Sequence, residues 1–423
     1  MKQVTDHRTP NAAGRRAFLW NMIGSVINAG ATMLLTIVAT RLAGVEQGGI
    51  LGLAFGLCQV FATFANCEVR PFQSTDLDEQ FRFGEYYGLR ILTCAAMTVL
   101  CAAYVFGFQY SGEKALVIFS ICMFKMLDAF SDVFQGLFQQ QGHLEYAGQA
   151  LALRVFLAGC AYTVTLWLTQ NSILAAVSMP AASVLCIVLF DMRVAKRFVD
   201  RVRPVFSGAA CRKILAACLP LFASSFMNMY ILNATKMQVD AVIPQMQGYW
   251  TPLYMPAAII NLFSIFAFRP MLTTLRAKWN AKERNAFRRI VFVLIGWVIA
   301  VTLGVLAGAW FLGIPVLQLL YGLPLAPYRN VLMIVLLGGG LNALATVLYY
   351  VITIMRRQYF LLLGDGVTFA ATLLITPLFV RAQGLAGAGL AYLCSMAVRA
   401  FCLAWIAAFG YRTYWNQERN AKQ

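Results

Sequence analysis

Ionisable side chains stand inside long apolar stretches of this sequence, and these are its most informative residues. Lys125, Asp128 and Asp132 are spaced i, i+3 and i+7, so they form one stripe if that stretch is helical. The other such residues are Arg154, Arg269, Asp365 and Arg399. A charge at the centre of a bilayer costs about 2.5–3.5 kcal/mol on insertion scales, so it persists only beside a partner or water. The pattern indicates an internal polar cavity or a set of buried ion pairs.

The first interpretation is a net-basic cavity that binds an anionic headgroup. Lys125, Arg154 and Arg399 favour it, because these cations outnumber the nearby acids. Arg269 is assigned to the same cavity, although its long side chain is equally well placed to reach the lipid headgroups. These four cations are therefore the candidates for substrate binding.

The second interpretation is internal pairing, which would hold helices together without touching a substrate. Lys125 could pair with Asp128, and Arg154 with Asp132. Asp365 starts a later apolar stretch and fits either interpretation. We assign the three carboxylates to gating or charge pairing and leave both interpretations open.

Polar stripes at helical spacing occur in two further apolar stretches. Asn21, Ser25, Asn28 and Thr32 form the first, and Ser225, Asn228 and Thr235 form the second. Both stripes could line a cavity between two halves of the protein, with Asn28 and Asn228 contacting substrate. Hydrogen bonding between helices in lipid explains such residues equally well.

The composition identifies the elements that must position these groups. Hydrophobic residues make up 60% of the 423 residues and charged residues only 12%, whereas soluble domains are about 45–50% apolar. A transmembrane helix needs about 20 consecutive apolar residues, whereas barrel strands alternate over about ten. The chain is therefore predicted to be an all-α polytopic membrane protein, and a soluble globular protein or a β-barrel is excluded.

About twelve transmembrane helices are predicted from the apolar runs. They fall at 18–42, 46–66, 88–108, 114–138, 148–168, 172–192, 214–234, 248–272, 290–312, 329–354, 359–380 and 385–410. The stretch 313–328 is broken by Gly and Pro, which predicts a short interfacial helix and turn instead of a span.

The basic residues predict the orientation in the membrane. With both termini in the cytoplasm, the inner segments hold about five times as many Lys and Arg as the outer ones, as the positive-inside rule requires. The outer ends would then carry Arg41, Lys114, Lys236, Arg329 and Arg381. The net charge of +17 is largely explained by this asymmetry, so nucleic acid is not expected as a partner.

Short matches between the halves recur at nearly one offset. They pair Arg15-Arg16 with Arg212-Lys213, Arg70-Pro71 with Arg269-Pro270, and Arg90-Ile91 with Arg289-Ile290. We predict two six-helix bundles related by a pseudo-two-fold axis along the membrane normal. The expected division is an N-terminal bundle 1–192, a basic cytoplasmic linker 193–213, a C-terminal bundle 214–410 and a cytoplasmic tail 411–423.

Enzymatic motifs are missing from the sequence. It contains no phosphate-binding loop, no zinc-binding HExxH and no GxSxG nucleophile elbow. The 11 cysteines lie mostly singly in apolar runs, and there are only two histidines. We expect no catalytic residues, no metal and no cofactor, and therefore no enzyme.

Short strings in the first third of the chain, in their order and spacing, resemble a known family. They are Thr40-Arg41-Leu42-Ala43-Gly44, Gly48-Gly49-Ile50, Glu68-Val69-Arg70-Pro71-Phe72-Gln73-Ser74-Thr75-Asp76, Tyr86-Tyr87-Gly88-Leu89-Arg90 and Gln140-Gln141-Gly142. The chain resembles the oligosaccharide flippases of the multidrug/oligosaccharidyl-lipid/polysaccharide exporter superfamily. Arg41, Arg70 and Arg90 occupy motif positions and are assigned to folding or gating.

The resemblance implies alternating access that carries an undecaprenyl-pyrophosphate-linked oligosaccharide from the inner to the outer leaflet of the bacterial cytoplasmic membrane. Such export serves cell-surface polysaccharide synthesis. It also implies that basic cavity residues, here Lys125, Arg154, Arg269 and Arg399, grip the diphosphate. The expected partners are the lipid-linked anionic glycan, membrane lipids, H+ or Na+, and other glycan-assembly proteins. The peptidoglycan-precursor relatives have fourteen spans, whereas twelve are predicted here. This difference argues against lipid II as the substrate.

Other functions compete with this one. A cation-coupled multidrug exporter of the same superfamily should have mainly acidic cavity residues, and the three acids leave it open. A glycan polymerase or ligase would need a long outer loop. A non-transporting scaffold of a glycan assembly complex would tolerate loss of the buried charges.

Overall fold

The computed structural model describes residues 10–420 except 77, 111, 200 and 357. It leaves the side chains of residues 10–13, 259, 262–270, 273, 358 and 416–420 undescribed. The chain divides into two compact units, Met1–Phe226 and Met227–Gln423. Helix α9 (Gly208–Val242) contributes residues to both units.

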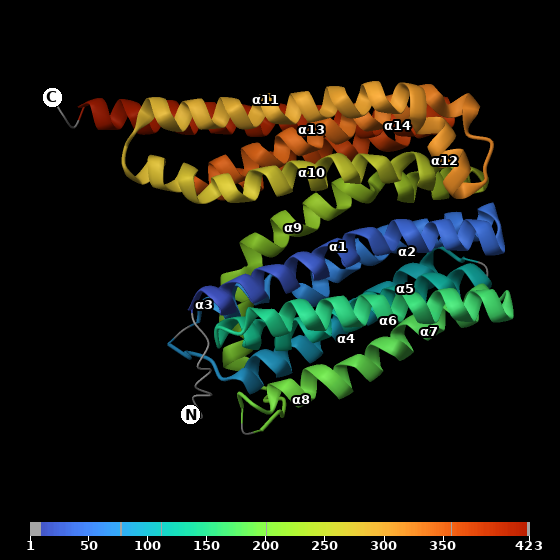
Figure 1. Cartoon of the computed structure of the whole chain (residues 1–423), viewed down its shortest axis with the longest axis horizontal. Coiled ribbons are helices and arrows are strands. Elements are labelled where there is room, and N and C mark those ends of the chain that lie inside the picture. The colour runs from blue at the N-terminus through green and yellow to red at the C-terminus, as the bar shows by residue number, and fades with distance from the viewer. Residues whose placement is uncertain (1–9, 77, 111, 200, 357, 421–423) are drawn as a thin grey trace. The chain divides into compact units, whose positions relative to one another are not determined.

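All regular elements of the described residues are helices (Figure 1). Those before α9 are α1 (Pro10–Ala43), α2 (Val45–Asn66), α3 (Val69–Thr75), α4 (Phe83–Gly107), α5 (Gly112–Gln140), α6 (Leu144–Thr169), α7 (Ser172–Cys186), the π-helical η1 (Ile187–Asp191) and α8 (Met192–Ala195). Those after α9 are η2 (Pro244–Met246), α10 (Gln247–Asn280), α11 (Arg284–Gly308), η3 (Ala309–Gly313), α12 (Ile314–Tyr321), η4 (Ala326–Tyr328), α13 (Arg329–Ile354) and α14 (Gln358–Asn420).

Nine segments of the described residues are long and apolar enough to cross a membrane. One of them, 359–415, consists of two helices joined at Gly384, where the backbone is not helical. The charged α5 and the incompletely described α10 are also long enough to span. With these, the helices follow the predicted spans, and α12 is the short helix predicted within 313–328.

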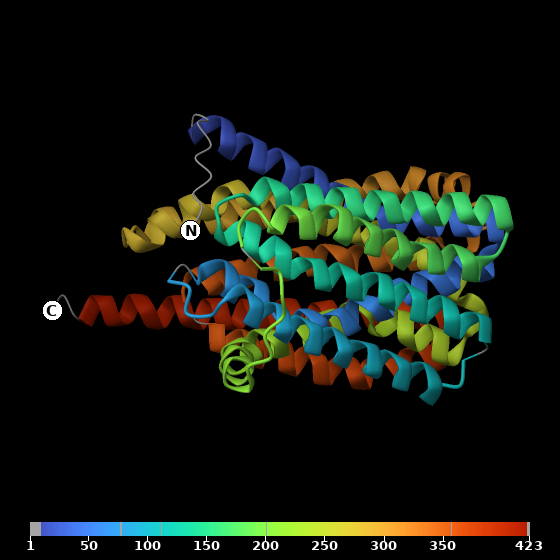
Figure 2. The ribbon, with the colours of Figure 1, turned by 90° about the horizontal axis from the view of Figure 1, so that it is seen from below.

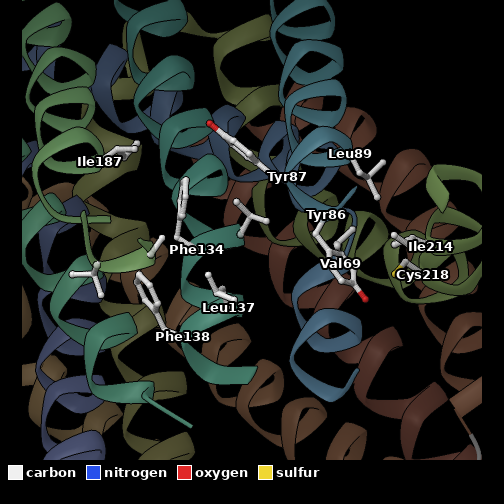
Figure 3. Packing of buried hydrophobic residues seen from close by; sticks show 13 residues of the cluster. Val69, Tyr86, Tyr87, Leu89, Phe134, Leu137, Phe138, Ile187, Ile214 and Cys218 are labelled. Atoms are coloured by element: carbon white, nitrogen blue, oxygen red, sulfur yellow. The ribbon is translucent and has the colours of Figure 1, made fainter. Parts of the chain in front are cut away.

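In the first unit α2 is central, because it packs against α1, α4 and α5 and is almost entirely buried. Figure 2 shows the long helices of this unit running alongside one another. A hydrophobic cluster joins Tyr86 and Tyr87 of α4 to Phe134 and Phe138 of α5 (Figure 3). Ile214 of α9 belongs to the same cluster, so the start of α9 is anchored in the first unit.

The chain reverses sharply between α2 and α3, because Cys67 and Glu68 both adopt left-handed backbone angles. Helix α3 then lies against α5 at a very close approach. A Cβ at Gly136 would be 2.4 Å from Oε1 of Gln73, and the buried Gln73 donates to the carbonyl of Val133 at 3.1 Å. This contact fixes α3 on α5 and so holds Arg70 beside α5.

Helix α1 is held against α6 by another close approach. A Cβ at Gly148 would be 2.6 Å from the backbone nitrogen of Asn21, and a Cβ at Gly24 would be 2.9 Å from the carbonyl oxygen of Gly148. Asn21 donates to the carbonyl of Leu144 at 3.0 Å. The first residue of the predicted polar stripe therefore joins two helices.

Helix α13 is central in the second unit, and its close packing requires three consecutive glycines. A Cβ at Gly338, Gly339 or Gly340 would collide with Tyr392, Ala257 or Thr302, respectively. These residues lie on α14, α10 and α11, so each glycine admits a different neighbouring helix.

Helix α14 bends because Gly384 has φ 58° and ψ −129°, which side chains disfavour. Gly387 allows the bend to be tight, since a Cβ there would lie 1.8 Å from the carbonyl oxygen of Phe379. The two parts of α14 lie against each other, since a Cβ at Gly364 would be 3.2 Å from the side chain of Leu403, and α14 also packs against α13.

Candidate functional site: a charge network on α5

The charged stripe of α5 is the centre of an ion-pair network in the first unit. Arg154 of α6 pairs with Asp128 of α5 and also lies 3.7 Å from Asp191 of η1. Ser131 of α5 donates to Asp191 at 2.5 Å and accepts a hydrogen bond from Arg154. One guanidinium therefore joins three helical segments through two carboxylates.

Asp132, one turn further along α5, is shared by two arginines. Arg70 of α3 lies 2.8 Å from it, and Arg90 of α4 lies 3.3 Å from it. Arg70 also donates to Gln135 at 3.0 Å, and Gln135 donates to Ser131 at 3.3 Å. These hydrogen bonds connect the two ends of the stripe into one network.

Lys125 completes the network, with its Nζ 2.6 Å from Asp128. We call these seven groups the N-terminal charge network: Arg70, Arg90, Lys125, Asp128, Asp132, Arg154 and Asp191. It contains four cations and three carboxylates, so it keeps the net positive charge predicted from the sequence. Its cations also have carboxylate partners, which is the arrangement that the pairing interpretation describes.

Burial divides the four cations into two kinds. The side chains of Arg90 and Arg154 are only 1% exposed, whereas those of Arg70 and Lys125 are 29% and 22% exposed. Asp128 is shared by one cation of each kind, and so is Asp132. Each carboxylate therefore keeps a buried partner if its accessible partner moves away.

The pairing differs in detail from the pairs considered in the sequence. Lys125 does pair with Asp128, but Arg154 pairs with Asp128 and Asp191, and Asp132 pairs with Arg70 and Arg90. Sequence reasoning missed Asp191. It ends a π-helical turn, a distortion frequent at functional sites, and the only signal was a lone carboxylate closing an apolar run.

The second unit contains a simpler arrangement. Arg399 is buried in the second part of α14, with its Nε 3.5 Å from Asp365 in the first part. Arg399 also donates to Asn342 of α13 at 3.1 Å. Asn342, another residue that sequence reasoning missed, is buried as well.

Lys236 is buried in α9, only 4% exposed, and its position at an outer end stays a prediction. Its Nζ donates to Asn233 at 3.1 Å and lies 4.7 Å from the ring centre of Tyr254. Trp250 and Tyr254 are also buried, so they do not form the exposed belt typical of aromatic residues near the headgroups. Sequence alone does not indicate this burial, because a long basic side chain near the end of a span usually reaches water.

The remaining predicted residues lie apart from these two clusters. Arg41 is exposed in the last turn of α1, and Asn28 is half-buried on the same helix. Asn228 is half-buried on α9. Arg269 lies in α10, but its side chain is outside the described residues.

Comparisons with known proteins identify the fold. No family model and no curated protein matches the sequence. Among solved structures, an inward-facing multidrug resistance MATE family transporter of the MOP superfamily matches 92% of this chain and 98% of its own, with TM-score 0.69 and 13% identity. The Vibrio cholerae MATE transporter VcmN in the bent form matches 95% of this chain and 98% of its own, with TM-score 0.55 and 12% identity.

A third match is a MOP superfamily transporter from Pyrococcus furiosus, for which reverse polarity of the binding pocket is described as suggesting a different function. It covers 95% of this chain and 96% of its own, with TM-score 0.59 and 15% identity. This chain therefore has the fold of these MOP superfamily transporters, in which twelve transmembrane helices form two bundles. It is a multi-pass membrane protein.

Proposed function

We propose that the chain is an alternating-access flippase that carries a polyprenyl-pyrophosphate-linked oligosaccharide from the inner to the outer leaflet of a bacterial cytoplasmic membrane. The observation that carries this proposal is the excess of cations over carboxylates in the N-terminal charge network. Such a network attracts an anionic headgroup, because the attraction between opposite charges is stronger away from water.

The shared carboxylates suggest how the network binds a diphosphate. Removing one partner of a buried ion pair leaves an uncompensated charge, which costs about 3–5 kcal/mol. Here Asp128 would keep Arg154 when Lys125 turns to a phosphate, and Asp132 would keep Arg90 when Arg70 does so. We therefore assign substrate contact to Lys125 and Arg70.

The buried arginines take a different role in this proposal. Arg154 and Arg90 hold the two carboxylates in place, and Arg399 holds Asp365 in the second unit. The roles of Asn28, Asn228 and Arg269 as further substrate contacts stay predictions. The same holds for gating by Arg41, for the bundle boundaries at 192 and 214, and for the cytoplasmic termini.

The test is the accumulation of lipid-linked glycan in cells that depend on this chain for glycan export. Lys125→Gln is expected to cause accumulation at normal protein level, because it removes a phosphate contact and leaves Asp128 paired. Lys114→Gln is the matched control, with the same charge loss on the same helix but near Tyr110. Equal export by both variants and the unaltered chain would overturn the proposal.

A cation-coupled multidrug exporter is the second candidate, because several matched structures are described as MATE family or multidrug resistance transporters. It predicts that loss of the chain sensitises cells to cationic drugs without glycan accumulation. The carboxylates would then be the essential groups, so Asp128→Asn would impair export more than Lys125→Gln. A scaffold without transport predicts that neither substitution matters.

A further inference from the structure

Seven exposed cations outside the charge network lie on the segment between α7 and α9 and on the first turns of α9. We call them the linker surface: Arg193, Lys196, Arg197, Arg201, Arg203, Arg212 and Lys213. Clusters of four to eight Lys and Arg next to a membrane span are typical of contacts with anionic lipid.

These cations lack ion-pair partners within the part of the chain that the structure describes. Arg197 alone has a polar side-chain contact there, at 3.5 Å from the hydroxyl of Tyr146. The N-terminal charge network, by contrast, supplies each of its four cations with a carboxylate. Within the described residues the cations of the linker surface are therefore exposed and without a carboxylate partner, which makes them accessible to an anion.

The backbone that carries these cations is held to the first unit. The ring of Phe198 lies 5.2 Å from that of His143, and the backbone nitrogen of Val205 donates to the carbonyl of Gly84 at 2.8 Å. Gly88 leaves the room for this contact, because a Cβ there would lie 2.3 Å from the carbonyl oxygen of Val205. Because this backbone is already ordered, less conformational entropy is lost when a ligand binds.

Apolar side chains project beside the cations. Phe206 is 60% exposed and Val205 is 49% exposed, and both follow shortly after Arg203. Exposed aromatic and aliphatic groups among Lys and Arg are the pattern of segments that rest on a bilayer surface. An acidic protein or a nucleic acid would bind the cations but would provide no apolar environment for Val205 and Phe206.

We propose that the linker surface binds the headgroups of anionic phospholipids in the leaflet beside it, with Val205 and Phe206 entering the acyl boundary. This interaction is separate from transport of the substrate. It would retain anionic lipid beside the segment that joins α7 to α9.

The experiment measures phosphatidylglycerol binding by the full chain in a non-ionic detergent, with bound lipid counted by mass. The triple variant Lys196→Gln/Arg201→Gln/Arg203→Gln is compared with the control Arg276→Gln/Arg288→Gln/Arg289→Gln, which loses the same charge from exposed positions of α10 and α11. We expect the linker variant to bind about 100-fold more weakly and the control to be unaffected. Rising salt should erase the difference.

A charge-preserving variant separates binding from folding. Arg201→Lys/Arg203→Lys should bind phosphatidylglycerol nearly as well as the unaltered chain, and thermal unfolding of all variants reports whether each is folded. The proposal is overturned if phosphatidylcholine binds as well as phosphatidylglycerol, or if linker and control variants lose binding equally. Retention of an acidic peptide or RNA with no phosphatidylglycerol binding would also overturn it.

Discussion

Buried charge is arranged differently in the two units, although each has an arginine–aspartate pair between its fifth and sixth long helices. In the first unit, Arg154 on the fifth long helix pairs with Asp191 at the end of the sixth. In the second unit the signs are exchanged, with Asp365 before the α14 bend and Arg399 after it. The fourth long helix supplies a polar neighbour in each case, Ser131 or Asn342.

The difference lies in how many partners each charge has. Arg154 has two carboxylates, and Asp128 and Asp132 each have two cations, whereas Arg399 lies beside the carboxylate of Asp365 and the amide of Asn342. A carboxylate shared by two cations keeps one of them when the other moves, whereas displacing Arg399 would take a buried cation away from Asp365. We infer that the first unit is suited to capturing an anion and the second to holding its helices together.

The largest expected effect is on Arg154. Replacing it in Arg154→Leu leaves Asp191 buried without its cation and removes the buried partner of Asp128, so unfolding should become easier by about 3–5 kcal/mol. Thermal unfolding of the purified chain in detergent measures this loss. Adding Asp191→Asn should recover part of it, and an unchanged midpoint for Arg154→Leu alone would contradict the network.

The next effect concerns the buried pair of the second unit. Arg399→Leu should destabilise the chain by about 3 kcal/mol, because it leaves the buried Asp365 without this cation. Adding Asp365→Asn should recover part of that loss, because it removes the carboxylate that has lost its cation. If the double variant unfolds as early as Arg399→Leu alone, the loss does not arise from the charge of Asp365.

A smaller effect is expected where the fifth and sixth helices connect. Gly384→Ala should cost about 1–2 kcal/mol, since its backbone conformation is unfavourable for a side chain. In the first unit the corresponding turn is capped by Asn171, whose side chain accepts from Ile173 at 2.9 Å and Leu174 at 3.0 Å. Asn171→Ala should lower the free energy of unfolding by about 1 kcal/mol. Thermal unfolding of both variants measures the two losses, and a larger loss for Asn171→Ala than for Gly384→Ala would contradict this order.

The smallest effect on stability is expected for Lys125. Its partly exposed pair should contribute about 0–1 kcal/mol, because Asp128 keeps Arg154 and solvent screens the rest. Thermal unfolding of Lys125→Gln beside Arg154→Leu tests this ordering. Comparable losses would show that Lys125 is structural and would remove the reason for assigning it to substrate.

The sequence predicted the helices well because apolar runs of spanning length have few alternatives. It also placed the charges of α5 on one stripe, since helical spacing alone determines that. The partners of that stripe could not be predicted, because they depend on how α3, α4, α6 and η1 pack around α5. The π-helical turn that positions Asp191 has no reliable sequence signature.

Burial near helix ends is harder to predict from the sequence. Lys236 and Trp250 are residue types that often contact headgroups, but packing between α9 and α10 buries them. Gly338, Gly339 and Gly340 each permit close packing against a different helix. Small residues in a span indicate that two helices approach closely, whereas amphipathic side chains occur both at the membrane interface and in the protein interior.

The most direct test of the central claim is the binding of a polyprenyl pyrophosphate to the purified full chain at low and high salt. The account predicts that Lys125→Gln weakens binding at least tenfold at low salt, with Lys114→Gln and the unaltered chain equal and thermal unfolding unchanged in both variants. Equal binding by all three proteins, or binding that does not respond to salt, would contradict it.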